Sequence, residues 1–169
     1  RKIASLKAFF HFLEYEEILE DNPFNKIRLS FREPKRLPKT IPANTIQTFL
    51  NIIYQEAQQD TTPGRKRTVL RDIAVIELLF ATGVRISELC SLKYEDIDME
   101  NHSLLIWGKG AKERIIQIGN PDVRSALSAY INAFQPQILN SGWLFVNRLG
   151  NRLSEQSVRL MINKYVKMA

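Results

Sequence analysis

The sequence predicts a mainly α-helical fold with a small antiparallel β-sheet of about three strands. Apolar residues recur at helical spacing in several long segments, which indicates amphipathic helices. Two short segments rich in β-forming residues, "SLLIW" and "RIIQI", are joined by the glycine-containing stretch "GKGAKE", as is typical of a β-hairpin. A further short apolar segment, "WLFV", predicts the third strand.

Composition limits the kind of protein. Of the 169 residues, 44% are hydrophobic and 25% charged, as in folded proteins, and no apolar run has the length of a membrane span. The net charge of +6 suits a polyanionic partner but also occurs in proteins without one. The single cysteine, Cys90, excludes an internal disulfide, and its apolar neighbours predict a buried, reduced thiol. We expect a cytoplasmic protein, cut from a longer chain at both ends.

The first half of the chain predicts helices separated by a basic linker. Apolar spacing predicts a helix over residues 2–20, which ends before "EDNPF" because Pro23 disfavours helix at the preceding residue. The segment "NKIRLSFREPKRLPKTIP" has six basic residues, one acid and three prolines, which predicts an extended linker. Helical spacing resumes after Pro42, and "QEAQQDTTPGRKR" is predicted to be a polar loop. Residues 68–82 are predicted to form a buried helix that Gly83 caps.

The second half predicts three more helices. "RISELCSL" predicts a short helix that begins near Arg85. After the hairpin, "NPDVRSALSAYINAF" predicts a helix with Asn120 as its N-cap and Pro121 in its first turn. "SEQSVRLMINKYVKM" predicts a final helix with Ser154 as its cap and Tyr165 on its apolar, core-facing side.

Several kinds of site lack their sequence pattern. The acidic stretch "YEDIDMEN" has neither the glycine nor the distal glutamate of a calcium loop, so we interpret it as a solvated loop. The two histidines, His11 and His102, have no partner at ligand spacing. "GKG" lacks the spacing of a phosphate-binding loop, and no GxGxxG follows a strand. We therefore predict no metal and no cofactor.

Two features remain as candidate chemistry. Arg85 follows a rigid buried helix, and a guanidinium on a fixed backbone can grip two oxygens of one phosphate. Glu88, three residues later, is placed to orient Arg85, and the alternative is that the two residues form a purely structural ion pair. Lys109 lies between two glycines at the predicted hairpin tip, and a lysine there can donate a proton to a leaving oxygen. The alternative is an ordinary exposed turn lysine.

The segment "ATGVRISELCSLKYEDIDMENHSLLIWGKGAKERIIQI" resembles the first half of the catalytic domain of tyrosine recombinases, the phage integrase and Xer-type family. In that family a "TGLRxSEL"-like motif supplies the first catalytic arginine, and a "GKGxKxR"-like hairpin supplies the catalytic lysine. Arg85 and Lys109 match these positions, and the pair of motifs is specific where each alone is not. The resemblance implies a helical core-binding (SAM-like) domain ending within residues 1–33, a basic linker over 34–42, and an incomplete recombinase catalytic domain over 43–169.

The resemblance also implies an activity. A tyrosine attacks a DNA phosphodiester and forms a 3′-phosphotyrosyl link without metal or nucleotide cofactor. Arg85 is then expected to stabilise charge on the non-bridging oxygens, Lys109 to protonate the leaving 5′-oxygen, and Glu88 to hold Arg85. Double-stranded DNA is the implied partner, with a tetramer on two DNA sites for the longer protein and a monomer for this chain. The expected phosphate contacts are Lys35, Arg36, Lys39, Arg65, Arg67, Lys112 and Arg114.

The sequence departs from the family pattern in its last third. A His-x-x-Arg motif and a late nucleophilic tyrosine are expected downstream, but no histidine follows His102. Tyr165 falls on a predicted apolar face and Tyr130 lies within a predicted helix, so we assign no nucleophile. We expect this chain to be inactive alone. The alternatives are a non-catalytic DNA-binding relative or regulator that keeps the fold, or a helical protein-interaction module.

Overall fold

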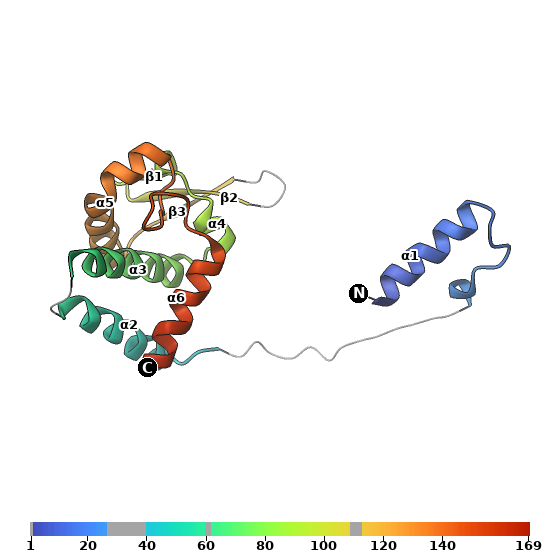
Figure 1. Cartoon of the computed structure of the whole chain (residues 1–169), viewed down its shortest axis with the longest axis horizontal. Coiled ribbons are helices and arrows are strands. Elements are labelled where there is room, and N and C mark those ends of the chain that lie inside the picture. The colour runs from blue at the N-terminus through green and yellow to red at the C-terminus, as the bar shows by residue number, and fades with distance from the viewer. Residues whose placement is uncertain (1, 27–39, 60–61, 109–112) are drawn as a thin grey trace. The chain divides into compact units, whose positions relative to one another are not determined.

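The computed structural model describes residues 2–26, 40–59, 62–108 and 113–169. The chain divides into two compact units, Arg1–Thr40 and Ile41–Ala169 (Figure 1). Helices dominate, and one three-stranded antiparallel sheet lies in the second unit, which confirms the predicted fold class. None of the helices within these described ranges combines the length and the apolar character needed to span a bilayer.

The first unit contains α1 (Lys2–Tyr15) and the 3-10 helix η1 (Pro23–Asn25). The predicted helix over 2–20 is therefore too long at its C-terminal end. The chain leaves the helix because Glu17 adopts a left-handed backbone with φ of 57°, and the N–H of Ile18 donates to the carbonyl of Leu13 over 3.0 Å. This bonding pattern ends many helices, and the pattern of apolar residues alone does not reveal it.

The second unit is built around one long buried helix, α3. Its elements are α2 (Ala43–Gln58), α3 (Pro63–Thr82), α4 (Ile86–Cys90), the 3-10 helix η2 (Tyr94–Asp96), β1 (Ile97–Asp98), β2 (Ser103–Trp107), β3 (Glu113–Gln117), α5 (Pro121–Ser141) and α6 (Glu155–Met168). Helix α3 packs against α2, α4, α5 and α6. Residues 72–78 are all buried, which confirms the prediction of a helix covered on most sides.

The sheet has the strand order β1-β2-β3, with both pairs antiparallel. Strands β2 and β3 pair from Ser103 opposite Gln117 to Trp107 opposite Glu113, so the predicted hairpin is confirmed. On the other edge, Ile97 of β1 pairs with Leu104 of β2. The sheet thus places β1, which directly follows η2, beside β2 of the hairpin stem.

The third strand is not the one expected. Residues 143–146, "WLFV", form no strand, and Trp143 makes only an isolated bridge with Lys93. Leu144, Phe145 and Val146 are almost completely buried in the core. The apolar run therefore reflects burial, because a short buried segment has the same composition whether or not it pairs in a sheet.

The predicted polar loop between α2 and α3 is also wrong in extent. Helix α2 continues to Gln58 and α3 already begins at Pro63. Proline fits the first position of a helix because its missing N–H has no partner there in any case. Arg65 and Arg67 consequently lie in the first turns of α3 and not in a loop.

The predicted N-caps and core residues are confirmed, but the helix predicted over residues 120–134 continues through Pro136 to Ser141 as α5, because Ile138 extends its buried face. Asn120 accepts a hydrogen bond from the N–H of Asp122 over 2.8 Å, and Ser154 accepts one from the N–H of Ser157 over 3.1 Å. Such N-caps satisfy amides that have no partner within the helix. Cys90 is a free, buried thiol, and burial raises its pKa to about 11.

Candidate functional site

The candidate site begins where α3 ends. Gly83 has a φ of 63°, and its N–H donates to the carbonyl of Leu79 over 3.0 Å, so this glycine caps the helix as predicted. Glycine adopts this left-handed conformation without the steric cost that a Cβ brings. Val84 is buried, and Arg85 follows as the N-cap of α4. The backbone of Arg85 is thus held between two helices.

Glu88 contacts Arg85 through both backbone and side chain. The N–H of Arg85 donates to Oε2 of Glu88 over 2.9 Å, and its Nη1 donates to Oε1 over 2.9 Å. The side chain of Glu88 is only 7% exposed, whereas that of Arg85 is 74% exposed. The carboxylate therefore anchors one edge of a guanidinium that otherwise faces solvent, and the predicted contact between the two residues is present.

A second arginine contacts the same carboxylate. Nη1 and Nη2 of Arg114, on β3, donate to Oε1 and Oε2 of Glu88 over 3.2 and 2.7 Å. This bidentate contact is the largest influence on the carboxyl group and, with the contacts from Arg85, lowers the pKa of Glu88 to about 2. Glu88 is therefore ionised throughout the neutral range, with two guanidinium partners.

A pocket of about 400 Å³ lies at this cluster and is lined by Arg85, Ser87, Glu88, Ser91 and Trp107. Two guanidiniums against one carboxylate leave a local net charge of +1. Serine hydroxyls add small polar groups, and Trp107 forms one wall from β2. An exposed guanidinium at a pocket beside this cluster is chemically suited to bind an oxyanion such as a phosphate.

The acidic stretch beside the pocket is structural in part. Asp96 is 8% exposed and accepts hydrogen bonds from the N–H of Lys93 over 2.7 Å and from Nε1 of Trp107 over 3.2 Å. The prediction of a solvated loop is therefore wrong for this residue, whose carboxylate fastens β2 to η2. Among the residues that the structure describes, no three His, Cys, Asp or Glu side chains are grouped to hold a metal ion.

Several predicted site residues lie outside the described residues. The strands on either side of the hairpin tip end at Trp107 and begin again at Glu113. The predicted functional residues that fall in the undescribed segments are Lys35, Arg36, Lys39, Lys109 and Lys112.

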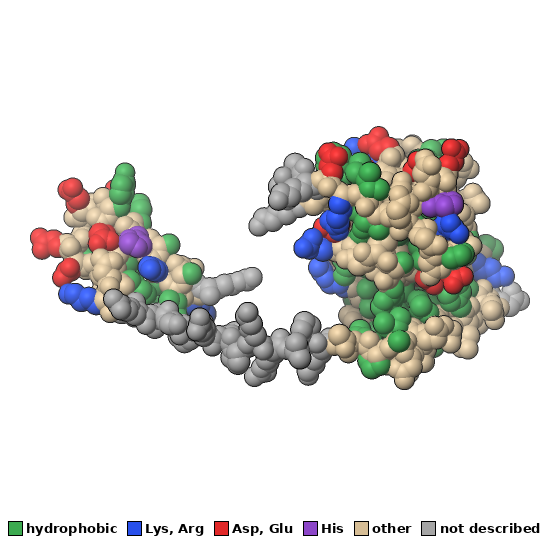
Figure 2. Space-filling view, turned by 180° about the vertical axis from the view of Figure 1, so that it is seen from behind, with side chains coloured by type: hydrophobic (Ala, Val, Ile, Leu, Met, Phe, Trp, Pro, Cys, Tyr) green, Lys and Arg blue, Asp and Glu red, His purple; other side chains and the backbone are tan. Residues whose placement is uncertain are grey.

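Arg65 and Arg67 lie far from Arg85. About 15 helical residues separate Arg67 from Thr82, which corresponds to roughly 22 Å along α3. Nη2 of Arg65 donates to Glu56 over 3.0 Å, and the guanidinium of Arg67 lies 4.4 Å from the ring centroid of Phe134. Because of this separation, one phosphate cannot bridge these arginines and Arg85. Figure 2 shows basic side chains of the second unit in separate groups.

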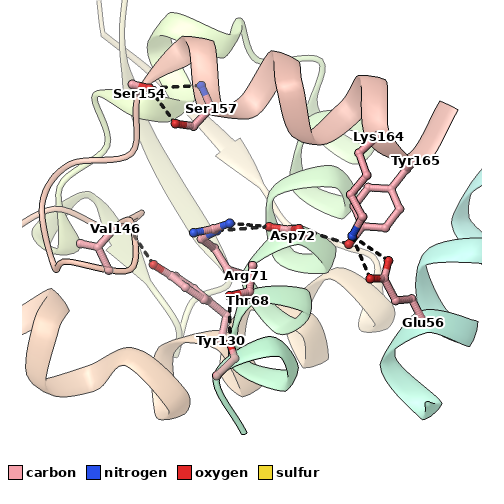
Figure 3. A network of polar contacts seen from close by, with 11 residues as sticks. Glu56, Thr68, Arg71, Asp72, Tyr130, Val146, Ser154, Ser157, Lys164 and Tyr165 are labelled. Carbon is pink, nitrogen blue, oxygen red and sulfur yellow. Dashed lines mark hydrogen bonds and ion pairs between the residues drawn. The ribbon is translucent and has the colours of Figure 1, made fainter. Parts of the chain in front are cut away.

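A buried polar network fixes Tyr165 (Figure 3). Its hydroxyl donates to Oδ2 of Asp72 over 3.1 Å, and Asp72 also accepts from Nη2 of Arg71 over 2.8 Å. Lys164 donates to Glu56 of α2 over 2.8 Å, so α6 is tied to both α3 and α2. Burial, followed by the neighbouring carboxylates, raises the pKa of Tyr165. This confirms its core assignment and leaves no access for a ligand.

Tyr130 is equally enclosed. Its hydroxyl donates to the carbonyl of Leu144 over 3.0 Å and accepts from the N–H of Val146 over 2.9 Å. Burial raises the pKa of Tyr130 to about 12. Neither of the two tyrosines that follow the hairpin is therefore available to attack a phosphate.

Arg152 supports the site and is not predicted from the sequence. Its Nε donates to the carbonyl of Cys90 over 2.8 Å, its Nη2 donates to Ser91 over 3.1 Å, and its guanidinium stacks on Trp143 at 4.9 Å. The two hydrogen bonds give partners to polar groups at the C-terminal end of α4, the helix that begins next to Arg85. These two hydrogen bonds span more than 60 residues of sequence, so no local pattern indicates them.

Comparison with known proteins identifies the family. The model of the phage integrase family matches residues 40–169. The chain belongs to the phage integrase family. A tyrosine recombinase of Agathobacter rectalis is 52% identical over 169 residues, which are 100% of this chain and 55% of that protein. Tyrosine recombinase XerC of Bacillus subtilis is 34% identical over 174 residues, covering 100% of this chain and 54% of XerC. The chain thus spans about half the length of the curated relatives it matches.

Two solved structures of other proteins have the same fold as this chain. The XerH site-specific recombinase bound to difH substrate, in a pre-cleavage complex, superposes with a TM-score of 0.70 at 19% identity, over 98% of this chain and 46% of XerH. A lambda integrase tetramer bound to a Holliday junction gives a TM-score of 0.65 at 19% identity, over 97% of this chain and 45% of the integrase. At these identities the likeness establishes the fold.

Proposed function

We propose that the full-length protein containing this chain is a site-specific DNA recombinase or integrase, which cleaves and rejoins strands through a 3′-phosphotyrosyl intermediate. Membership of the phage integrase family and relatives named tyrosine recombinases support the proposal. The observation that carries it is the setting of Arg85. Its exposed guanidinium projects from a fixed backbone, beside a buried carboxylate, at a pocket next to the Arg85, Glu88 and Arg114 cluster, in which two guanidiniums share one carboxylate.

In the proposed reaction a tyrosine hydroxyl attacks phosphorus, and the bond from phosphorus to the 5′-oxygen breaks. The non-bridging oxygens gain charge as this happens, and Arg85 donates hydrogen bonds to them. Lys109 gives its proton to the departing 5′-oxygen. The phosphotyrosyl link conserves the bond energy for the second transfer, so the proposal includes no metal or nucleotide cofactor.

Glu88 has a supporting role in this proposal. Its carboxylate accepts one N–H of Nη1 of the Arg85 guanidinium, and the other N–H groups of the guanidinium can turn to phosphate oxygens. Because Arg114 shares the carboxylate, Glu88 does not neutralise Arg85 fully. Stabilisation of a developing negative charge needs an arginine that is held in position and keeps its positive charge.

Double-stranded DNA is the proposed partner. The net charge of +6 supports it, as do relatives whose structures contain DNA: XerH bound to difH substrate and a lambda integrase tetramer bound to a Holliday junction. By analogy we propose a tetramer on two DNA sites for the full-length protein, a monomer for this chain, and a cytoplasmic location. Residues 34–42, between a core-binding part over 1–33 and a catalytic part over 43–169, are proposed to follow the phosphate backbone through Lys35, Arg36 and Lys39.

The 169-residue chain alone is proposed to bind DNA without cleaving it. Tyr130 and Tyr165 are buried and hydrogen-bonded, which supports the absence of a nucleophile among them. The same observation supports the alternative that the protein is a non-catalytic DNA-binding relative or regulator. The two readings differ in what the full-length protein does to DNA.

A nicked suicide duplex carrying the protein's recombination site separates these readings. The full-length protein is expected to form a covalent adduct that survives denaturing electrophoresis, whereas the 169-residue chain shifts the duplex only in a native gel. An adduct formed by the chain itself contradicts the proposal that it lacks the nucleophile. A full-length protein that binds the site without any adduct is the non-catalytic relative.

A further inference from the structure

Arg114 is held by a carboxylate rather than directed to solvent. Both of its terminal nitrogens are engaged by Glu88, over 3.2 and 2.7 Å, although its side chain remains 41% exposed. A fork of this kind, on a carboxylate that is only 7% exposed, is among the stronger polar contacts in proteins. To bind a phosphate with the same two nitrogens, Arg114 must first release the carboxylate of Glu88. The buried carboxylate then lacks this partner, which costs free energy.

The hairpin stem is attached to the rest of the unit at two points near its tip. Arg114, on β3, lies opposite Ile106 and reaches Glu88 of α4. Trp107, the next residue on β2, donates to Asp96 of η2. One contact thus comes from each strand, and each ends on a different carboxylate. Both strands of the stem are therefore fixed close to residues 109–112, through Trp107 before that segment and Arg114 after it.

We propose that Arg114 is a positioning residue. Its fork fixes the carboxylate of Glu88, and through it the guanidinium of Arg85, and it holds the hairpin stem against α4. This inference rests on the proposed function, since it gives Arg85 its catalytic role. Without Arg114, both carboxylate oxygens of Glu88 are left to Arg85 alone. The guanidinium of Arg85 then turns inward to form the fork itself and withdraws the donors that the phosphate needs.

The side-chain chemistry of lysine separates positioning from a phosphate contact. Lysine keeps the charge of Arg114 but cannot form a fork. In the full-length protein we expect Arg114→Lys and Arg114→Gln to slow adduct formation on the suicide duplex to a similar extent, on the order of tenfold. Arg159→Gln is the matched control, because it breaks an exposed pair with Glu155 on α6 with the same change of charge. We expect its rate to stay within about twofold of the parent.

A double-variant cycle tests whether Arg114 acts through Glu88. If it does, Arg114→Gln combined with Glu88→Gln is no slower than Glu88→Gln alone, because the second change removes nothing further. Losses that multiply, or an Arg114→Lys variant with the parent rate, overturn the proposal. The slope of log affinity for DNA against log salt concentration gives a further test. If the magnitude of this slope falls by about one in Arg114→Gln but not in Arg159→Gln, a phosphate contact has been lost and the proposal is overturned.

A measurement without DNA distinguishes this inference from the proposed function. Carbon NMR of the Glu88 carboxyl group in the 169-residue chain gives its pKa, which we expect to rise from about 2 towards the ordinary value in Arg114→Gln. An unchanged pKa overturns the positioning role. A raised pKa, in a full-length protein that forms no adduct, supports the contact and rejects the catalytic assignment. If Arg114→Gln does not fold, the comparison is made with Arg114→Lys, whose loss of the fork is expected to shift the resonances of Glu88 and Arg85.

Discussion

The hydroxyl of Tyr165 donates a hydrogen bond to Asp72 over 3.1 Å, and both side chains are almost completely buried (Figure 3). The contact joins α6 to the centre of α3 across 93 positions of sequence. It makes Tyr165 part of the framework of the unit. The last tyrosine of the chain therefore serves the fold, although its late position alone would suit a nucleophile.

Tyr165→Phe is expected to lower the free energy of unfolding by about 1–2 kcal/mol, because Asp72 loses a buried donor. Urea unfolding followed by the fluorescence of Trp107 and Trp143, both in the second unit, measures this. The full-length variant should still form its DNA adduct. Tyr15→Phe is the control, since Tyr15 is 83% exposed and should leave stability unchanged. A folded Tyr165→Phe protein that has lost the adduct would show that this tyrosine is the nucleophile.

The two ends of α3 offer a second prediction, because alanine has opposite effects there. Gly83 has a φ of 63° and open space around its Cα, so Gly83→Ala meets no clash but forces an L-residue into the left-handed region, at a cost of about 1 kcal/mol or more. Gly64 lies within the first turn and is also unobstructed, so Gly64→Ala should stabilise the helix by about 0.5 kcal/mol.

Gly83→Asn is the conservative test of the same point, since asparagine tolerates the left-handed conformation better than alanine. Thermal unfolding of the three variants gives the comparison. Equal losses for Gly83→Ala and Gly83→Asn would mean that backbone strain is not what Gly83 avoids.

The ionisation of Glu88 predicts a pH dependence of stability. Its pKa is about 2 in the folded protein and near its ordinary value of about 4.3 in the unfolded chain. An acid with a depressed folded pKa stabilises the fold above its unfolded pKa, and this contribution disappears as the pH falls towards the folded pKa. The stability difference between the parent and Glu88→Gln should therefore be largest above about pH 5 and shrink steadily down to about pH 2.

Because other carboxylates titrate in the same range, the difference between the two proteins is the informative quantity. Urea unfolding at several pH values supplies it. If the difference in free energy of unfolding between the parent and Glu88→Gln stays constant from pH 6 to pH 2.5, the charge of the Glu88 carboxylate contributes nothing to stability.

Local signals explain what the sequence predicts correctly. Gly83 ends a buried helix, Asn120 and Ser154 begin helices, and the hairpin follows from two β-rich segments around glycines. Each of these features depends on residues within a few positions of one another. The contact between Arg85 and Glu88 belongs to the same class, since three residues separate them.

Contacts between distant residues explain what the sequence does not predict. Arg114 reaches Glu88 across 26 positions, so no local pattern indicates this contact, and the basic side chain alone predicts a phosphate contact. The run "WLFV" has the composition of a strand because Leu144 and Phe145 fill the core. Whether an apolar segment pairs or only packs is decided by elements elsewhere in the chain.

We propose above all that Arg85 is a charge placed for a DNA phosphate. The rate at which full-length Arg85→Ala forms the adduct on the suicide duplex decides this point, with circular dichroism as the check on folding. Loss of one preorganised donor to developing charge typically costs about 100-fold or more in rate, and we predict a loss of that order. A folded Arg85→Ala protein that forms the adduct within about twofold of the parent rate would contradict the claim, because the Arg85 and Glu88 pair would then be purely structural.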